Sequence, residues 1–311
     1  MRAIRRLAAG REGFALPAVL WVLIVAAALA AELHAGVRAD QRVTANARAA
    51  ARARWAARAG MAQAVEALRS RIAVTAVGGE GLAVTDTLLI PVQRLDVDGV
   101  QVTATVTDAR ARLQLNLATQ DELRALFTAL GWERGRAASR AAAVARWRSA
   151  HLPPFEAAPD TTRIRLRPPP GAFAAVEELR GVPGWTEPEY AAAAPYLTVV
   201  SDGRINLNTA PVPVLRTLPA IGPDAAEAIV RRRRGHPLST VYDVGEALPA
   251  AVRNDAQAVM AELVARAAFV PREAEVRVTA VPPGAPVRAR LHAVAVMTGG
   301  TRLPVVQVVE R

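Results

Sequence analysis

The stretch "GFALPAVLWVLIVAAALAAE", residues 13–32, decides the fold of this 311-residue chain. Its uncharged apolar part, Phe14 to Ala31, would span roughly 27 Å as a helix, enough to cross the hydrocarbon core of a membrane. A secretory signal has a shorter apolar core and is usually followed by a break, whereas helix-favouring residues continue here. We therefore predict one long helix, with residues 14–35 in the membrane and residues 36–71 in water.

The residues before this run indicate orientation and processing. Four arginines, Arg2, Arg5, Arg6 and Arg11, precede it, and the positive-inside rule places the N-terminus in the cytoplasm and the rest across the membrane. In "REGF", Gly13-Phe14 resembles the cleavage site of type IV pilin-like precursors, whose dedicated peptidase leaves the apolar helix on the mature protein. The resemblance implies a leader of residues 1–13, cleavage between Gly13 and Phe14, and N-methylation of Phe14.

One departure from the pilin pattern narrows the class. Most pilin-like proteins carry glutamate at the fifth mature residue, where it meets the N-terminal amine of the neighbouring subunit, and Ala18 stands there in this chain. The absence of this glutamate points to a subunit that needs no such neighbour on one side. Within the superfamily, the class that lacks this glutamate is the K-type minor pseudopilin of type II secretion, which this chain resembles.

Composition excludes several kinds of chemistry. The apolar content of 52% is sufficient for buried cores, and the net charge of +11 comes from arginines, which we interpret as a solvated surface. The chain has no cysteine, and therefore no disulfide or thiol nucleophile. Its four histidines are scattered, and no nucleophile elbow, phosphate loop or dinucleotide fingerprint occurs. These features predict a protein that is not an enzyme and has no cofactor.

Strand patterns occur at both ends of the globular part. "TLLIPVQRLDV" and "VQVTATVT" are separated by Asp98-Gly99, a strong hairpin signal, and three more strand-like segments follow after residue 268. We predict an α+β fold in which the long N-terminal helix packs on one antiparallel sheet. Residues 72–114 and 269–311 form the two pilin-like β parts, and residues 115–268 form a large all-helical insertion. K-type pseudopilins resemble the chain in carrying such an insertion.

The helical insertion contains an internal repeat. "RLQLNLATQDELRAL" (112–126) aligns without gaps with "RINLNTAPVPVLRTL" (204–218). We predict two related subdomains, about 115–200 and 201–268, that resemble SAM-like or helix-hairpin-helix units. Each opens with a strand-like segment that leads into a helix. The expected N-caps are Thr119, in a capping box with Glu122, and Thr209 or Asn208, with Pro211 in the first turn.

The second copy carries a candidate hairpin, "LPAIGPDAAEAIVRRRRGHP", with Ala220, Ile221 and Gly222 in its turn. Such hairpins bind DNA phosphates through backbone N–H groups, so the alternative function is a membrane-anchored helix-hairpin-helix DNA receptor of the competence type. Several residues oppose this alternative: Ala220 where glycine is usual, Asp224 in the next turn, and Trp132 and Glu133 in the first copy. We expect the run Arg231 to Arg234 to be a solvated helix end, and nucleic acid not to be a partner.

The resemblance implies a minor pseudopilin at the tip of the type II secretion pseudopilus, which initiates or caps assembly for protein export. Expected partners are the I- and J-class minor pseudopilins, the inner-membrane platform and the prepilin peptidase. The expected location is a single-pass position in the inner membrane, with a periplasmic globular part. Some K-type pseudopilins are associated with calcium. This chain shows no D-x-D-x-D loop, so the sequence assigns no metal ligands.

Overall fold

The computed structural model describes residues 15–77, 86–150, 171–218, 221–247, 263–297 and 305–310. The first helix, α1 (Ala15–Val77), runs without interruption through both Pro17 and Gly36. Pro17 lies in the first turn, where a helix tolerates proline. We expected the helix to fade near Arg71; it continues to Val77, because neither proline nor glycine intervenes before Gly78.

Both ends of the globular part contribute to one antiparallel sheet, as predicted. Its strands are β1 (Gln93–Val97), β2 (Val100–Asp108), β7 (Glu273–Val281), β8 (Ala289–Val296) and β9 (Val305–Glu310), and their order in the sheet is β1-β2-β7-β8-β9. The β1–β2 turn has positive φ at Asp98 (50°) and Gly99 (77°), which confirms the hairpin that the Asp-Gly pair predicts. The chain is therefore an α+β protein whose sheet joins distant parts of the sequence.

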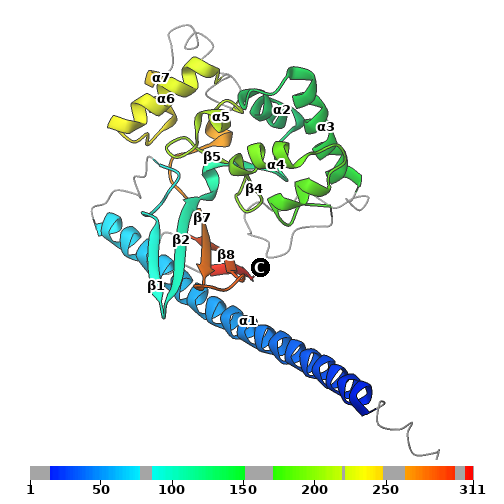
Figure 1. The fold of residues 1–311 in the computed structure, drawn as a ribbon. Coiled ribbons are helices and arrows are strands. Elements are labelled where there is room, and N and C mark those ends of the chain that lie inside the picture. The colour runs from blue at the N-terminus through cyan, green and yellow to red at the C-terminus, as the bar shows by residue number, and fades with distance from the viewer. Residues whose placement is uncertain are drawn as a thin grey trace, which may run out of the picture.

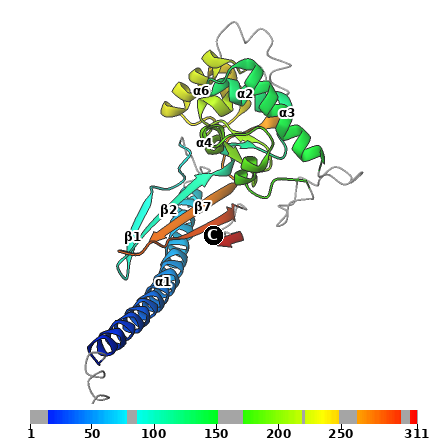
Figure 2. The ribbon, with the colours of Figure 1, turned by 45° about the vertical axis from the view of Figure 1, so that its right-hand side comes forward.

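The C-terminal half of α1 lies across this sheet, while the N-terminal half projects away from the globular part (Figures 1 and 2). The contact face of α1 is built from small residues, among them the buried Ala53, Ala56 and Ala64. A Cβ atom at Gly60 would come within 2.5 Å of Val102 Cγ1. Glycine is therefore required at this position for the helix to approach β2 closely.

A helical block continues from the end of β2 and returns to the sheet at β7 (Figure 1). We name its two parts the first helical unit (residues 113–198) and the second helical unit (residues 205–268). A short 3₁₀ helix, η1 (Ala109–Ala111), leads into the block. The first unit contains β3 (Leu113–Gln114), α2 (Gln120–Ala129), α3 (Arg134–Ala150), η2 (Val176–Gly181), α4 (Glu187–Ala193), η3 (Ala194–Tyr196) and β4 (Leu197–Thr198). The second contains β5 (Ile205–Asn206), α5 (Val212–Leu215), α6 (Pro223–Gly235), α7 (Val241–Ala247) and β6 (Ala267–Ala268).

The helical block is not all-helical, which corrects the prediction. In each unit the opening strand pairs in parallel with the closing strand: β3 with β4, and β5 with β6. Backbone hydrogen bonds hold the opening and closing segments of each unit together. Leu115 N–H donates to Thr198 O at 2.7 Å, and Leu207 N–H donates to Ala268 O at 2.9 Å, so both ends of each unit are joined by hydrogen bonds.

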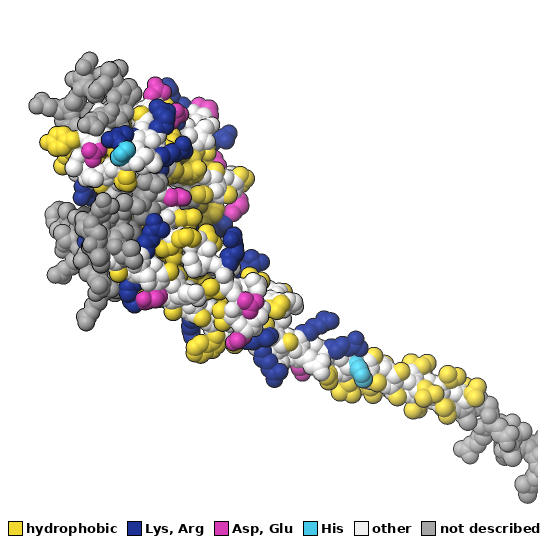
Figure 3. All heavy atoms as spheres, turned by 90° about the vertical axis from the view of Figure 1, so that its left-hand side faces the viewer, with side chains coloured by type: hydrophobic (Ala, Val, Ile, Leu, Met, Phe, Trp, Pro, Cys, Tyr) yellow, Lys and Arg dark blue, Asp and Glu magenta, His cyan; other side chains and the backbone are white. Residues whose placement is uncertain are grey.

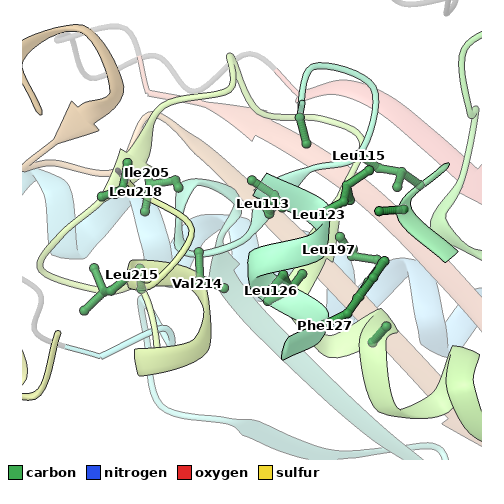
Figure 4. Close-up of a cluster of buried hydrophobic side chains, with 14 of the residues drawn as sticks. Leu113, Leu115, Leu123, Leu126, Phe127, Leu197, Ile205, Val214, Leu215 and Leu218 are labelled. Atoms are coloured by element: carbon green, nitrogen blue, oxygen red, sulfur yellow. The ribbon is translucent and has the colours of Figure 1, made fainter. Parts of the chain in front are cut away.

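The two units share one hydrophobic core. Figure 4 shows Leu113, Leu123 and Leu126 of the first unit facing the side on which Ile205, Val214 and Leu218 of the second unit lie. All six are buried. A separate core lies between α1 and the sheet. The described residues thus form two cores, one under α1 and one inside the helical block.

Candidate assembly site: the N-terminal helix and the anchored helical block

The N-terminal half of α1 is bare. Residues 16–48 are all exposed, including Leu16, Trp21 and Ile24, at 75%, 69% and 63% of their surface. An 18-residue window of this helix has a mean hydropathy of 2.3 and no buried residue, so its length and composition suffice to cross a membrane. Figure 3 shows hydrophobic side chains covering the free end of α1, a surface that favours lipid or partner helices over water.

The predicted processing site, Gly13 and Phe14, lies outside the described residues, so cleavage and methylation stay predictions. Ala18 is in α1 with its side chain exposed. The first turn of α1 carries no acidic residue, and the first carboxylate after Phe14 in the sequence belongs to Glu32. The apolar part of the helix therefore carries no carboxylate, and a partner that covers it has no negative charge to neutralise.

The candidate hairpin turn differs from a phosphate-binding turn. The helix before it, α5, has only four residues, and Ala220 lies outside the described residues. The side chain of Ile221 is buried, and its N–H donates to Leu218 O at 3.1 Å. Gly222 is the N-cap of α6 with φ −71° and ψ −178°, an extended conformation that any residue adopts. Gly222 therefore needs no backbone freedom that only glycine has, and the hairpin turn, with Ala220 outside the described residues, stays a prediction.

In the first unit a carboxylate occupies the place that a phosphate would need. Glu133 accepts hydrogen bonds from Gly135 N–H at 2.8 Å and from Arg136 N–H at 2.9 Å, at the start of α3. These two bonds lower the pKa of Glu133. The neighbouring Trp132 stacks on Phe127, with ring centroids 4.8 Å apart. Both residues that opposed the DNA alternative in the sequence thus have other partners at this helix N-terminus.

The arginine run at the end of α6 was expected to be solvated, and for Arg233 this is wrong. Arg233 is buried and donates from Nη1 to Leu207 O and Ala210 O, both at 2.7 Å. Burial lowers its pKa to about 10. The side chain reaches back to the carbonyl groups between β5 and α5, which have no intrahelical donor. Arg233 is therefore part of the interior of the second unit and is not available to a ligand.

The first unit uses an arginine in the same way. Arg148, near the end of α3, donates from Nη1 to three carbonyl oxygens, those of Leu115, Asn116 and Ala118, at 2.8–3.0 Å. Leu115 and Ala118 align with Leu207 and Ala210 of the second unit. The repeat in the sequence therefore corresponds to a repeat in three dimensions, in which a helical arginine ties the connection after the opening strand.

Aligned polar residues inside the two units also make matching bonds. Asn116 donates to Phe173 O and accepts from Phe173 N–H, and Asn208 donates to Leu238 O and accepts from Leu238 N–H. The side chain of each asparagine thus holds a later segment of its own unit through hydrogen bonds to the backbone of that segment. Because Asn208 is used in this way, it does not cap α5 as expected.

The first helical unit is attached to the sheet through Glu275 of β7. Its carboxylate is buried and lies 2.6 Å from Arg112 Nη1, and it accepts a hydrogen bond from Thr198 Oγ1 at 2.6 Å. Arg277 Nη2 lies 2.7 Å from the same carboxylate. Burial opposes ionisation of Glu275, but the two arginines lower its pKa well below the usual range. The carboxylate therefore joins both ends of the first unit to the sheet.

The second helical unit is attached through Asp108, at the end of β2. Asp108 Oδ2 accepts from Asn206 Nδ2 and from Thr209 Oγ1, both at 2.7 Å, and its Oδ1 accepts from Arg110 N–H. Burial raises the pKa of Asp108, and these bonds act against the rise. Because the hydroxyl group of Thr209 bonds to Asp108, Thr209 does not cap α5. Pro211 is the N-cap of this helix and makes no side-chain hydrogen bond.

A third carboxylate, Glu273, lies beside these two anchors with an incomplete set of partners. Arg110 Nη2 is 2.5 Å from Asp202, whereas Arg110 Nε is 3.4 Å from Glu273 Oε2. Within the described part of the chain, that oxygen is buried and accepts no hydrogen bond. Burial raises the pKa of Glu273 to about 7. The junction of sheet and block thus contains one strongly ionised and one weakly acidic glutamate, two residues apart.

This junction was not predicted from the sequence, although the sequence holds a signal for it. "ARAR" places arginines at 110 and 112, and "EAE" places glutamates at 273 and 275 in an otherwise apolar strand. Residues two apart on a strand face the same side, so Glu273 and Glu275 lie on one side of β7. The two arginines, from η1 and the residue that follows it, are the cations that meet them there. Charges at alternate positions of a buried strand need partners of opposite charge, which would have linked the two segments.

No metal site is formed by the described residues: His, Asp and Glu side chains do not gather there in groups of three or more that could hold a metal ion. The association of some K-type pseudopilins with calcium therefore assigns no ligands among the described residues. Two tryptophans differ in their surroundings: Trp185 is buried in the first unit beside Phe127 and Trp132, whereas Trp55 of α1 is 69% exposed.

Two family models, both described as type II secretion system (T2SS) protein K, match residues 94–202 and residues 205–266. Together they cover the sheet hairpin and both helical units. The fold is similar to that of one chain in the crystal structure of the GspK-GspI-GspJ complex from the enterotoxigenic Escherichia coli type 2 secretion system. The TM-score is 0.58 at 16% identity, over 83% of this chain and 96% of that chain. Among curated proteins, no sequence matches the chain.

Proposed function

Because the chain belongs to the type II secretion system protein K family, we propose that it is the minor pseudopilin at the tip of the pseudopilus. There it would initiate or cap assembly for protein export across the outer membrane, in a role that involves no enzymatic reaction. One observation carries the proposal: α1 is a single helix whose apolar half is bare and whose other half is packed on the sheet.

This helix supports a two-stage use of the protein. In the membrane, the bare half is covered by lipid; in a filament, the same surface is covered by helices of other subunits. Removal of the arginine-rich leader by a prepilin peptidase between Gly13 and Phe14 would eliminate charges that hold the N-terminus on the cytoplasmic side. The globular part would then lie in the periplasm, and contacts with the inner-membrane platform would accompany extraction.

Two features support a position at the tip. Ala18 provides no carboxylate to pair with the N-terminal amine of a subunit above it. The helical block sits beyond the sheet, at the end of the molecule far from the free end of α1 (Figure 2). A bulky block there would obstruct the addition of another subunit. The proposed neighbours below are the I- and J-class minor pseudopilins, in keeping with the subunits of the similar complex.

The leader assignment is tested by intact-mass analysis of the membrane-extracted chain, produced with and without a prepilin peptidase. We expect a peptidase-dependent N-terminus at Phe14, with an added methyl group, and no cleavage when Gly13 is replaced by arginine. Gly10→Arg, within the same leader, is the matched control and should be cleaved. An uncut Met1 start in both samples, with the peptidase active on another substrate, would contradict the assignment.

The position in the filament is tested by labelling. An epitope inserted at Gly284, an exposed turn residue between β7 and β8, should carry gold label at one end of isolated pseudopili. The same epitope on the major subunit should label the whole length. Label along the filament from this chain would contradict a tip position, and a strain that lacks the chain should lose secretion and regain it when the wild-type gene is returned.

A further inference from the structure

Arg110 lies where the sheet and the helical block meet, and its side chain is 7% exposed. Two of its nitrogens bind Asp202: Nε donates to Oδ1 at 3.1 Å, and Nη2 donates to Oδ2 at 2.5 Å. Its Nη1 donates to Val270 O at 3.2 Å. The same Nε lies 3.4 Å from Glu273 Oε2, a buried oxygen that accepts no hydrogen bond within the described part of the chain. One arginine therefore faces two carboxylates and is hydrogen-bonded to Asp202 alone.

The two carboxylates belong to different parts of the molecule. Asp202 lies in residues 199–204, which we name the linker because they connect the first helical unit to the second. Glu273 is the first residue of β7 in the sheet. The Nε atom of arginine carries a single hydrogen, so it makes a good hydrogen bond to only one of the two carboxylates at a time. The choice between them decides how firmly Arg110 holds the linker.

The conformation of the linker depends on Asp202. Its Oδ1, the oxygen that accepts from Arg110 Nε, also accepts from Arg204 N–H at 3.1 Å. Between these residues Gly203 has φ +86°, and a Cβ atom there would come within 2.9 Å of Leu117 Cδ1. The carboxylate of Asp202 thus orients a tight turn that packs against the first unit. Loss of a bond from Arg110 gives this carboxylate, and the turn, more freedom to move.

The charges around Glu273 do not balance when every group is ionised. Arg110, Asp202, Arg272 and Asp108 surround it, and Arg272 Nε is 3.6 Å from Glu273 Oε1. Two cations thus face three carboxylates. Asp108 accepts three hydrogen bonds, which favour its ionised form, whereas Glu273 Oε2 lacks such donors among the described residues. Burial raises the pKa of Glu273 to about 7, so a proton on this carboxyl group removes the excess negative charge near neutral pH.

We propose that Arg110 is a two-position latch that the protonation of Glu273 controls. With Glu273 protonated, Arg110 binds Asp202 through both Nε and Nη2, and the linker is held as in the structure. When Glu273 loses its proton to solvent, its charged Oε2 attracts the Nε hydrogen, and Asp202 keeps only the bond from Nη2. The two acceptor oxygens lie 3.1 Å and 3.4 Å from Nε, so a small rotation of the guanidinium group is sufficient. The latch involves only residues of this chain and does not rest on the proposed role in the pseudopilus.

Histidine is the other side chain that ordinarily titrates near neutral pH, and the nearest one lies outside the latch. His292 Nε2 is 3.7 Å from Glu275 Oε2. Glu275 is bonded to Arg112 and Thr198, at the two ends of the first unit. Titration of His292 would therefore act on the attachment of the first unit, whereas titration of Glu273 acts on the linker. The two causes predict changes in different segments.

Hydrogen exchange of the full-length chain in detergent, followed by mass spectrometry at pH 5.5 and pH 8, tests the latch. Labelling times are scaled to the intrinsic exchange rate at each pH. We expect peptides that contain the linker to exchange about tenfold faster at pH 8, the effect of losing one hydrogen bond between charged groups. Peptides from β2 and β7 should exchange at the same scaled rate at both pH values. Equal linker exchange at both, or a rise that β2 and β7 share, would overturn the proposal.

Two isosteric changes hold the latch in its two positions. Glu273→Gln cannot ionise, so the linker should exchange slowly at both pH values. Asp202→Asn removes the competing charge, so Arg110 turns to Glu273 and the linker should exchange fast at both. Glu275→Gln, two residues along the same strand, is the matched control and should keep the tenfold difference. A linker that still responds to pH in Glu273→Gln would show that another group, such as His292, controls it, and the proposal would be wrong.

Thermal unfolding midpoints establish that each variant is folded under the labelling conditions. If Glu273→Gln does not fold, Asp202→Asn still decides the question, because Asp202 is the less buried partner and lies outside the sheet. Linker exchange in Asp202→Asn that stays slow at pH 5.5 and rises at pH 8, as in the wild type, would show that Arg110 does not choose between the two carboxylates.

Discussion

In the first helical unit Arg148 donates to the carbonyl groups that follow β3, and in the second unit Arg233 does the same after β5. Asn116 and Asn208, which follow the same two strands, hold later backbone segments by paired hydrogen bonds. Inside, the units thus follow one plan: polar side chains satisfy backbone groups that no helix or strand serves. Such a plan is independent of the surroundings of each unit.

Their attachments to the sheet differ. The first unit is joined to β7 through the carboxylate of Glu275, which forms an ion pair with Arg112 and accepts a hydrogen bond from Thr198. The second unit is joined to β2 by neutral donors, Asn206 and Thr209, which meet the carboxylate of Asp108. Two copies of one motif have therefore diverged where they contact the rest of the molecule, and the differences should be measurable at aligned positions.

The largest difference is expected between Arg112 and its aligned partner Arg204. Replacing Arg112 with leucine leaves the buried Glu275 without its closest cation and should lower the free energy of unfolding by about 3–5 kcal/mol. Arg204 is exposed and donates to Val264 O, so Arg204→Leu should cost less than about 1 kcal/mol. Chemical denaturation of the detergent-solubilised chain measures both. Equal losses would contradict the larger contribution that the buried ion pair of Arg112 is expected to make.

A smaller difference in stability is expected between the aligned asparagines, Asn208 and Asn116. Asn208 is buried and donates to both Leu238 O and Phe269 O, so Asn208→Ala leaves buried backbone groups unpaired and should cost about 2–3 kcal/mol. Asn116 is half-buried and serves Phe173 alone, so Asn116→Ala should cost about 1–2 kcal/mol. The same denaturation assay compares them. A larger loss at Asn116 would contradict this ranking.

The two neighbouring glutamates of β7 should respond to pH in opposite directions. Burial raises the pKa of Glu273 to about 7, above its ordinary 4.5, so the folded chain binds more protons between these values and stability should fall as pH rises through 7. We expect a loss on the order of 1–2 kcal/mol between pH 5.5 and 8, from this group. Glu273→Gln should abolish that loss, which thermal unfolding over this range measures.

Glu275 serves as the internal control for this prediction. Arg112 and Arg277 hold its pKa below the ordinary value despite burial, so its contribution is present at neutral pH and is lost only in acid. Glu275→Gln should therefore lower stability at pH 7 and leave the slope between pH 5.5 and 8 unchanged. A Glu273→Gln variant with an unchanged slope would show that another group causes it.

Features that depend on neighbouring residues could be predicted from the sequence, whereas features that depend on contacts between distant residues could not. The Asp98-Gly99 turn, the capping box at Thr119 and the repeat itself depend on neighbouring residues or on copies of the same pattern, and the structure confirms all three. The burial of Arg233 and the roles of Thr209 and Asn208 depend on which distant group reaches them. Thr209 would have capped α5 if Asp108 were not within reach of its hydroxyl group.

The smallest difference is expected at the caps of the aligned helices. Thr119 caps α2: its Oγ1 accepts from Glu122 N–H at 3.1 Å, while Thr119 N–H donates to Glu122 Oε2 at 2.7 Å. Thr119→Ala removes the first of these bonds and should cost about 1 kcal/mol. The aligned Pro211 makes no side-chain bond, so Pro211→Ala should change the free energy of unfolding by about 0.5 kcal/mol or less.

Thr119→Ser, which retains the hydroxyl group, is the control for this last comparison and should remain close to the wild type. The difference between Thr119→Ala and Pro211→Ala isolates the capping bond, because the two helices begin at aligned positions, at Gln120 and Val212, and both changes leave the shared core intact. If both variants lose the same stability, the capping box contributes nothing beyond the packing of α2. The capping box would then not distinguish the stability of the first unit from that of the second.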